Sequence, residues 1–85
     1  MKGGATMGTV NVRKLKGKLT EQGKNVVDLG EMIGYDRSAI YRRLANNGAS
    51  MTIDDANRII TALKLTQDEA ISIFFAQLIA NSATN

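Results

Sequence analysis

The sequence predicts a single all-α domain of five helices, and three observations point to it. Proline is absent from all 85 residues, which suits a bundle of uninterrupted helices. No stretch alternates apolar and polar residues as a strand does, whereas apolar residues recur three, four and seven positions apart in five segments. Four of these segments follow a residue that commonly caps helices. These residues are Asn25, Asp36, Thr52 and Thr66.

The first helix is expected over residues 11–22. Val12, Leu15 and Leu19 form one narrow apolar stripe, and Gly23 follows as a stop. Much of the remaining helix surface is basic, from Arg13, Lys14, Lys16 and Lys18.

The second helix is expected over residues 26–33, after the cap at Asn25. Its apolar stripe comprises Val26, Leu29 and Ile33. Gly34 then fits the left-handed conformation in which a helix ends at a tight turn.

A third helix is expected almost at once, over residues 37–46, with Asp36 as its cap. The dipeptide Asn47-Gly48 ends it. Its inward positions are apolar: Ala39, Ile40 and Leu44.

The fourth helix begins after Thr52, and Asp55 three residues later completes a pattern like a capping box. Asp54 and Asp55 are interpreted as charges that favour the positive start of a helix, not as metal ligands. Its apolar positions are Ile53, Ala56, Ile59, Ile60 and Leu63.

The fifth helix starts at the capping box of Thr66 and Glu69 and runs to about residue 81. One apolar stripe comprises Ile71, Phe74, Phe75 and Leu78, of which Phe74 and Phe75 are expected in the core. A second, partly apolar face either packs within the same chain or forms a homodimer interface. The residues of that tentative interface are Ile73, Ala76, Ile79 and Ala80.

The two ends differ in composition from this domain, which is expected over residues 11–81. Residues 1–10 are rich in glycine and small residues and predict a flexible arm, and residues 82–85 a short tail. Neither a signal-peptide stretch nor an apolar run long enough to span a membrane is present in the sequence, so a cytoplasmic protein is expected.

Composition and charge narrow the function. Cysteine and histidine are absent, which excludes disulfides, Cys or His nucleophiles and zinc fingers. No nucleophile–base pair or phosphate-binding loop is visible, so no enzymatic activity, cofactor or small-molecule ligand is expected. The net charge of +3 is unevenly spread, with +5 on residues 1–50 and −2 on residues 51–85. A polyanion is therefore expected to bind the N-terminal half.

The segment over residues 26–47 has residues that meet the structural requirements of a helix-turn-helix. Its sequence is VVDLGEMIGYDRSAIYRRLANN. Gly30 allows the two helices to cross closely, and Gly34 suits the turn. Tyr35 is expected to plug the turn as a structural residue, and Ile40 to anchor the second helix from its inner side.

The pattern L-G-x-x-I-G-Y-D-R-S-A-I-Y-R-R-L in this segment resembles the helix-turn-helix of Cro and lambda-repressor-type regulators. The resemblance covers about residues 12–80. It implies a five-helix lambda-repressor-like DNA-binding domain, in a small phage or prophage regulator such as a Cro-like repressor. Such a protein acts on double-stranded DNA in the cytoplasm of a bacterial host or on its nucleoid.

The sequence departs from that family at three positions. Gly30 stands where alanine is usual, and Val26 stands where a glutamine often contacts a phosphate, a role that Asn25 is expected to take. Arg43 stands where apolar or aromatic residues are common, so its stem is expected to pack while its guanidinium reaches a phosphate.

The resemblance also implies two kinds of site residue, those that read bases and those that contact phosphates. Those expected to read base edges lie on one face of the third helix: Arg37, Ser38, Tyr41 and Arg42. Those expected to contact phosphates are Asn25, Arg43, Asn46, Asn47, Lys14, Lys16 and Lys18.

Plainer interpretations remain open beside this one. The arginines and lysines are also compatible with a solvated helix face, and Tyr41 with a partly buried packing residue. A protein-interaction module on the same fold, such as an antirepressor or an inhibitor of a host protein, is the alternative function, because fold alone does not decide function.

Overall fold

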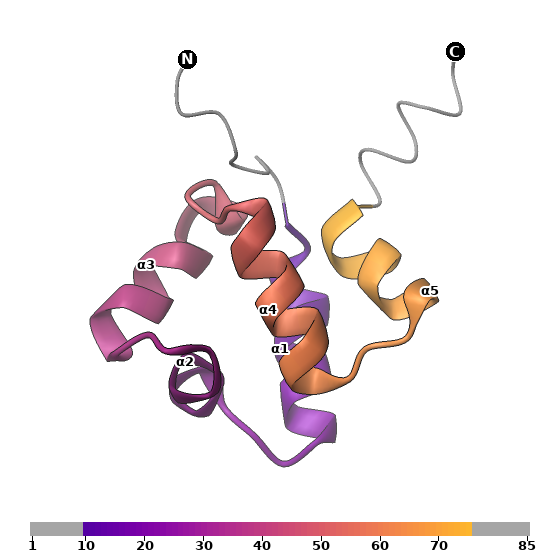
Figure 1. Ribbon diagram of the computed structural model, residues 1–85, viewed down its shortest axis with the longest axis horizontal. Coiled ribbons are helices and arrows are strands. Elements are labelled where there is room, and N and C mark those ends of the chain that lie inside the picture. Colours follow the sequence, from indigo (N-terminus) through magenta and orange to yellow (C-terminus); the bar gives the residue numbers. More distant parts are fainter. Residues whose placement is uncertain (1–9, 76–85) are drawn as a thin grey trace.

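Helices account for most of the computed structural model, which describes residues 10–75 (Figure 1). No β-strand occurs among these residues, so the prediction of an all-α domain is confirmed. The helices are α1 (Val12–Glu21), α2 (Val26–Ile33), α3 (Arg37–Gly48), α4 (Ile53–Leu63) and α5 (Gln67–Ala70), with a π-helical turn η1 (Ile71–Phe75) continuing α5.

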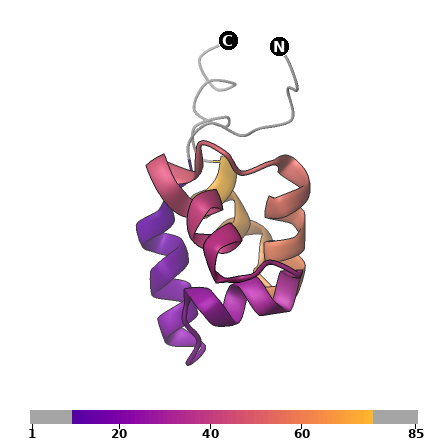
Figure 2. The ribbon, with the colours of Figure 1, turned by 90° about the vertical axis from the view of Figure 1, so that its left-hand side faces the viewer.

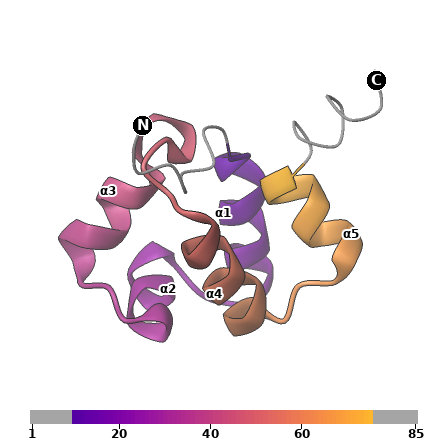
Figure 3. The ribbon, with the colours of Figure 1, turned by 45° about the horizontal axis from the view of Figure 1, so that its top comes forward.

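The helices are arranged around α1 and α4. In Figures 1 and 3, α2 and α3 lie on one side of this pair and α5 on the other. The pair α2–α3 is therefore remote from the C-terminal end of the described chain.

Each helix start is fixed by a side chain that accepts a hydrogen bond from the backbone amide three residues later. The predicted caps Asn25, Asp36, Thr52 and Thr66 all do so, as does Asn11 in front of α1. The capping boxes predicted for α4 and α5 are confirmed. An additional one at α2 closes through Asp28, whose carboxylate accepts from the Asn25 amide at 2.9 Å.

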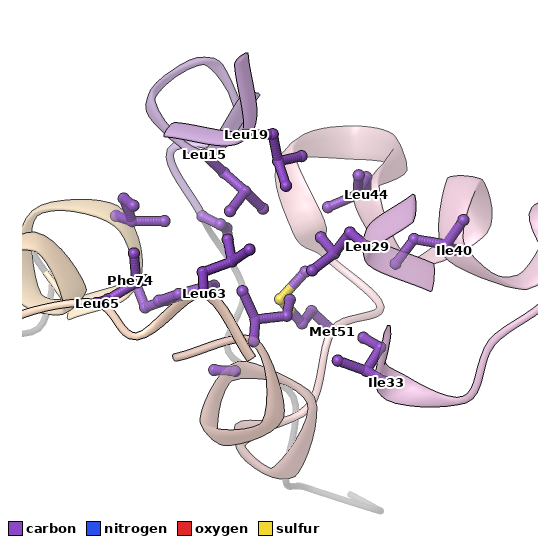
Figure 4. Close-up of a cluster of buried hydrophobic side chains, with 14 of the residues drawn as sticks. Leu15, Leu19, Leu29, Ile33, Ile40, Leu44, Met51, Leu63, Leu65 and Phe74 are labelled. Atoms are coloured by element: carbon purple, nitrogen blue, oxygen red, sulfur yellow. The ribbon is translucent and has the colours of Figure 1, made fainter. Parts of the chain in front are cut away.

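The apolar stripes meet in one core (Figure 4). Its predicted members are buried, which confirms the helical spacing: Leu15, Leu19, Val26, Leu29, Ile33, Ile40, Leu44, Ala56, Ile59, Leu63 and Phe74. Met51 and Leu65 join them from the connections before and after α4. The side chain of Phe75 lies outside the described residues.

Predicted inward positions that are not fully buried are corrected: Val12, Ala39, Ile53, Ile60 and Ile71. Ile53 is 50% exposed, since it is the first residue of α4 and lies about 120° around the helix from the buried Ile59. Ala39 is only half-buried, since Ile40 beside it takes the inward position on α3.

Val10 corrects the predicted extent of the N-terminal arm. Its side chain is buried in the core, and its amide donates to the Asn47 carbonyl at 2.7 Å. Gly48 makes room for it, since a Cβ there would lie 2.7 Å from the Val10 Cβ. The rest of the predicted arm and the tail lie outside the described residues.

The regular part of α3 ends earlier than predicted. Ala45 already has an extended ψ of 152°, and Asn46 and Asn47 adopt left-handed φ values of 54° and 58°. Asparagine and glycine tolerate this region best, so the sequence Asn46-Asn47-Gly48 turns the chain back toward the buried Met51.

The tentative dimer interface is corrected at Ile73. This side chain is buried in the core of its own chain, because η1 packs against α1 and the Ile73 carbonyl accepts from the Asn11 amide at 2.8 Å. The other proposed interface positions, Ala76, Ile79 and Ala80, and the end of the fifth helix lie outside the described residues.

Within residues 10–75 no helix has the length and apolar character needed to cross a membrane. The same part of the chain holds no cluster of three or more acidic side chains that suits a metal ion.

Candidate nucleic-acid interface

The turn between α2 and α3 is set by two glycines. Gly34 has a φ of 90° and ends α2 in the predicted left-handed conformation. At Gly30 a Cβ would lie 2.9 Å from the Tyr35 carbonyl oxygen and 3.0 Å from the Ile40 Cβ. The two helices therefore cross so closely that even an alanine at position 30 would need the turn backbone or Ile40 to shift.

The outer face of α3 carries the four residues predicted to read bases. Arg37, Ser38, Tyr41 and Arg42 are all exposed, whereas Ile40 and Leu44 anchor the opposite face in the core. Figure 2 shows α3 from this side, lying across the front of the molecule above α2.

Tyr41 is part of this outer face and not of the core. Its side chain is 47% exposed, and the Arg37 guanidinium carbon lies 6.0 Å from its ring centroid. A cation at this distance is attracted by the ring. The contact links the first and second turns of α3, so the two side chains form one continuous surface.

Beside Tyr41 lies a shallow hollow of about 270 Å³ that joins α3 to the end of α1 and the start of α2. Its polar lining includes Lys16, Thr20, Lys24 and Asn25. Among residues 10–75, none of the ion pairs includes Lys16 or Lys24. Two lysines and a helix N-terminus together make this hollow a positive surface.

The lysines of α1 lie on two different faces of the helix and have different partners. Lys14 Nζ donates to Ser72 Oγ at 2.6 Å, and Lys18 Nζ hydrogen-bonds Glu69 and pairs with Glu21 at 3.5 Å. Lys14 and Lys18 are four residues apart and share the face toward η1 and α5, whereas Lys16 lies on the opposite face.

The bond between Lys18 and Glu69 affects both titrations. It raises the pKa of the Lys18 ammonium and lowers the pKa of the Glu69 carboxyl below its ordinary value. Each charge is thus largely compensated within the protein, and Lys18 offers less free positive charge than Lys16.

Arg43 differs from the expectation that its guanidinium reaches outward. Its Nη1 donates to the Ser50 carbonyl at 2.8 Å, and its Nε lies 3.7 Å from Asp55 Oδ2. Its guanidinium carbon also lies 5.4 Å from the centroid of the Tyr35 ring. The guanidinium is therefore held by internal partners.

The three asparagines predicted to contact phosphates are exposed, but they differ in their setting. The Asn25 side-chain oxygen accepts from the Asp28 amide at 2.9 Å, directly at the start of α2. Asn46 and Asn47 lie beyond the regular end of α3, in the left-handed turn.

Asp55 is a residue whose importance the sequence did not reveal. It is 2% exposed; its Oδ1 accepts from the Tyr35 hydroxyl and its Oδ2 from the Thr52 amide at 2.9 Å. The capping pattern marks Asp55 only as a helix-start charge, and no local spacing connects it to Tyr35, twenty residues earlier.

The contacts of Asp55 shift two pKa values. Burial alone raises the pKa of its carboxyl, but the hydrogen bonds from Thr52 and Tyr35 and the charge of Arg43 outweigh burial, so the pKa lies below its ordinary value. The hydrogen bond to Asp55 raises the pKa of the Tyr35 hydroxyl. Asp55 is therefore ionised at neutral pH despite its burial.

Comparison with family models, with curated proteins and with solved structures returns no match to this chain. The function is therefore argued from the geometry of its own residues.

Proposed function

We propose that this protein is a sequence-specific double-stranded DNA-binding regulator of the small phage or prophage Cro-like kind, with α3 as its recognition helix. One observation carries the proposal. Arg37, Ser38, Tyr41 and Arg42 project together from a helix whose opposite face is fixed in the core. A major groove about 12 Å wide admits an α-helix with such a face.

Each exposed side chain of α3 suits a base edge. Arg37 and Arg42 have the fork of donors that bonds guanine through two acceptors, which discriminates by about 1–3 kcal/mol. Ser38 both donates and accepts, and Tyr41 offers an apolar ring edge to a thymine methyl and a hydroxyl to a phosphate.

The hollow beside α3 is suited to the DNA backbone. Lys16 and Lys24 supply positive charge beside the start of α2, where the helix dipole has the sign that attracts phosphate. The capping box engages the Asn25 and Asp28 amides there, so the two lysines carry most of this attraction. Contacts of this kind fix the register of a protein on the duplex without reading its sequence. The two kinds of contact thus lie side by side on one surface.

The proposal is tested by enrichment of a random duplex library with the full chain at several salt concentrations. The expected result is one defined site, with log K falling against log salt by about 0.9 per phosphate neutralised. Binding without salt dependence, together with no enriched sequence, would refute the proposal. The symmetry of the enriched site also tests the proposed homodimer, because a palindrome reports two protomers.

A protein-interaction module is the second candidate, and exposed apolar residues favour it. Met32 and Ile53 are exposed, and Met32 lines a groove between α2 and α4 together with Ala62. This candidate predicts that Met32→Lys abolishes binding to the partner protein, and that the duplex library returns no enriched site. The DNA-binding proposal predicts that Met32→Lys leaves the function of the protein unchanged and that the duplex library returns one defined site.

A further inference from the structure

A cluster behind the recognition helix joins three parts of the fold. Tyr35 comes from the turn after α2, Arg43 from the last regular turn of α3, and Asp55 from the first turn of α4. Among residues 10–75, Asp55 is the buried charged side chain, and both other members contact it. None of the three belongs to the exposed face of α3 that contacts DNA in the proposed function.

We propose that Arg43 is a positioning residue: with Asp55 and Tyr35 it fixes the orientation in which α3 presents its reading face, and it does not bind a phosphate itself. The inference rests on the proposed function and adds to it the residues on which the specificity of that site depends.

The need for such a tie follows from how α3 is held. Near its start, α3 is fixed by the close contact of Ile40 with Gly30, an apolar contact that sets distance but has no directional preference. At its other end the regular helix stops before Ala45, and a left-handed turn follows. The Val10 amide donates to the Asn47 carbonyl within that turn. From the regular helix itself, the directional bonds at that end come from Arg43, which donates to the Ser50 carbonyl and pairs with Asp55.

The same partners explain why Arg43 is not free for a phosphate. Its guanidinium already faces a carboxylate, a carbonyl and an aromatic ring, and only 34% of its side chain is exposed. Turning it outward would leave the ionised Asp55 buried without its cation, which is costly. Arg42, the preceding residue, has no such partner among the ion pairs of the described residues and is exposed.

The test compares two arginines in the full chain, one in the cluster and one remote from the reading face. Arg43→Met, Asp55→Asn and the control Arg13→Met, which removes the same charge from an exposed position on α1, are each measured for affinity to the enriched duplex and to a scrambled duplex across a salt series. We expect Arg43→Met and Asp55→Asn to lower the ratio of the two affinities by about tenfold with an unchanged salt slope. Their double variant is expected to lose no more than either one, because both remove the same tie.

Other outcomes overturn the inference. Equal losses on both duplexes, with the salt slope reduced by about 0.9, identify Arg43 as a phosphate ligand. An unchanged affinity ratio with only a lower melting temperature identifies a purely stabilising residue. Tyr35→Phe, which removes only one hydroxyl, supplies a milder variant of the same cluster if Arg43→Met does not fold.

A measurement on the free protein separates this inference from the proposed function. If the wild-type chain enriches no site, the DNA-binding proposal fails by itself. The positioning claim is then judged by the backbone amide resonances of residues 37–44. Larger shifts in Arg43→Met than in Arg42→Met support it, and shifts of equal size overturn it.

Discussion

Gly30 and Ile40 are in such close contact that a Cβ on residue 30 would lie 3.0 Å from the Cβ of Ile40. This one contact sets the distance between α2 and α3, and it depends on the missing side chain. The Tyr35 carbonyl oxygen, 2.9 Å from the same position, belongs to the backbone of the turn and cannot move aside without moving the turn.

Gly30→Ala is therefore expected to destabilise the protein, although alanine favours helices. Overpacking costs about 1–3 kcal/mol, and with a backbone oxygen and two Ile40 atoms within 3.0 Å the upper part of that range is expected, above the gain in helix propensity of about 1 kcal/mol. The matched control is Gly17→Ala in α1, where nothing lies within 4 Å, and stabilisation is expected. Chemical denaturation of both variants checks this, and a Gly30→Ala protein as stable as Gly17→Ala would contradict the crossing described.

Asp55→Asn is expected to lower stability at neutral pH by about 1–3 kcal/mol, since a buried carboxylate with charged and hydroxyl partners is lost. The folded-state pKa of Asp55 is depressed, so its contribution is complete above the unfolded value of about 3.9 and is lost as the pH falls through the folded value. The difference in stability between wild type and variant should therefore begin to shrink as the pH falls below about 4 and vanish only below the folded pKa.

The control for this prediction is Asp54→Asn. Asp54 is exposed and pairs with Arg58 at 3.0 Å on the surface, where such pairs contribute at most about 1 kcal/mol. Thermal melts of both variants from pH 7 to pH 3 decide the matter. A constant difference between wild type and Asp55→Asn over this range would show that the carboxylate charge is not what stabilises the cluster.

Val10→Ala is expected to destabilise the fold by about 1–3 kcal/mol, because the buried side chain fills the space left by Gly48. Val12→Ala, at a half-buried position two residues later, should cost less. Urea denaturation measures both. If Val10→Ala lost no more stability than Val12→Ala, Val10 would have to be assigned to the flexible arm that the composition predicts.

Much of the fold was predictable because its signals are local. Caps such as Asn25 and Thr66 act on amides three residues away, and the stripe of Val26, Leu29 and Ile33 follows from helical spacing alone. The burial of Val10 was not predictable, because its partners near Gly48 come from the far end of α3. The contacts of Arg43 were not predictable for a similar reason, since Asp55 lies on α4 and Ser50 in the connection before it.

The candidate site was predictable to a similar degree. The exposed face of Arg37, Ser38, Tyr41 and Arg42 follows from the position of Ile40 and the helical period. The sequence interpretation groups Lys14, Lys16 and Lys18 as one set of phosphate contacts, although the helical period already separates Lys16 from the other two, since residues two apart point to opposite sides. What each face of α1 contacts could be learned only from the structure: Lys14 binds Ser72, and Lys16 lines the hollow beside Tyr41.

Lys16→Ala is expected to weaken binding to every duplex alike and to reduce the salt slope by about 0.9, because Lys16 lines the hollow beside Tyr41. Lys14→Ala is the matched control: it removes the same charge from the opposite face of α1, where Lys14 binds Ser72. Its salt slope should stay close to that of wild type. Equal effects of the two substitutions would mean that net charge, and not this hollow, governs binding.

Duplex-library enrichment with wild type, Arg37→Ala and Arg42→Ala tests whether the outer face of α3 reads DNA sequence. We predict one defined site for wild type and, for each variant, relaxed preference at a different base pair, with about 1–3 kcal/mol of discrimination lost there. An identical enriched sequence for all three proteins, or no enriched sequence for wild type, would contradict it.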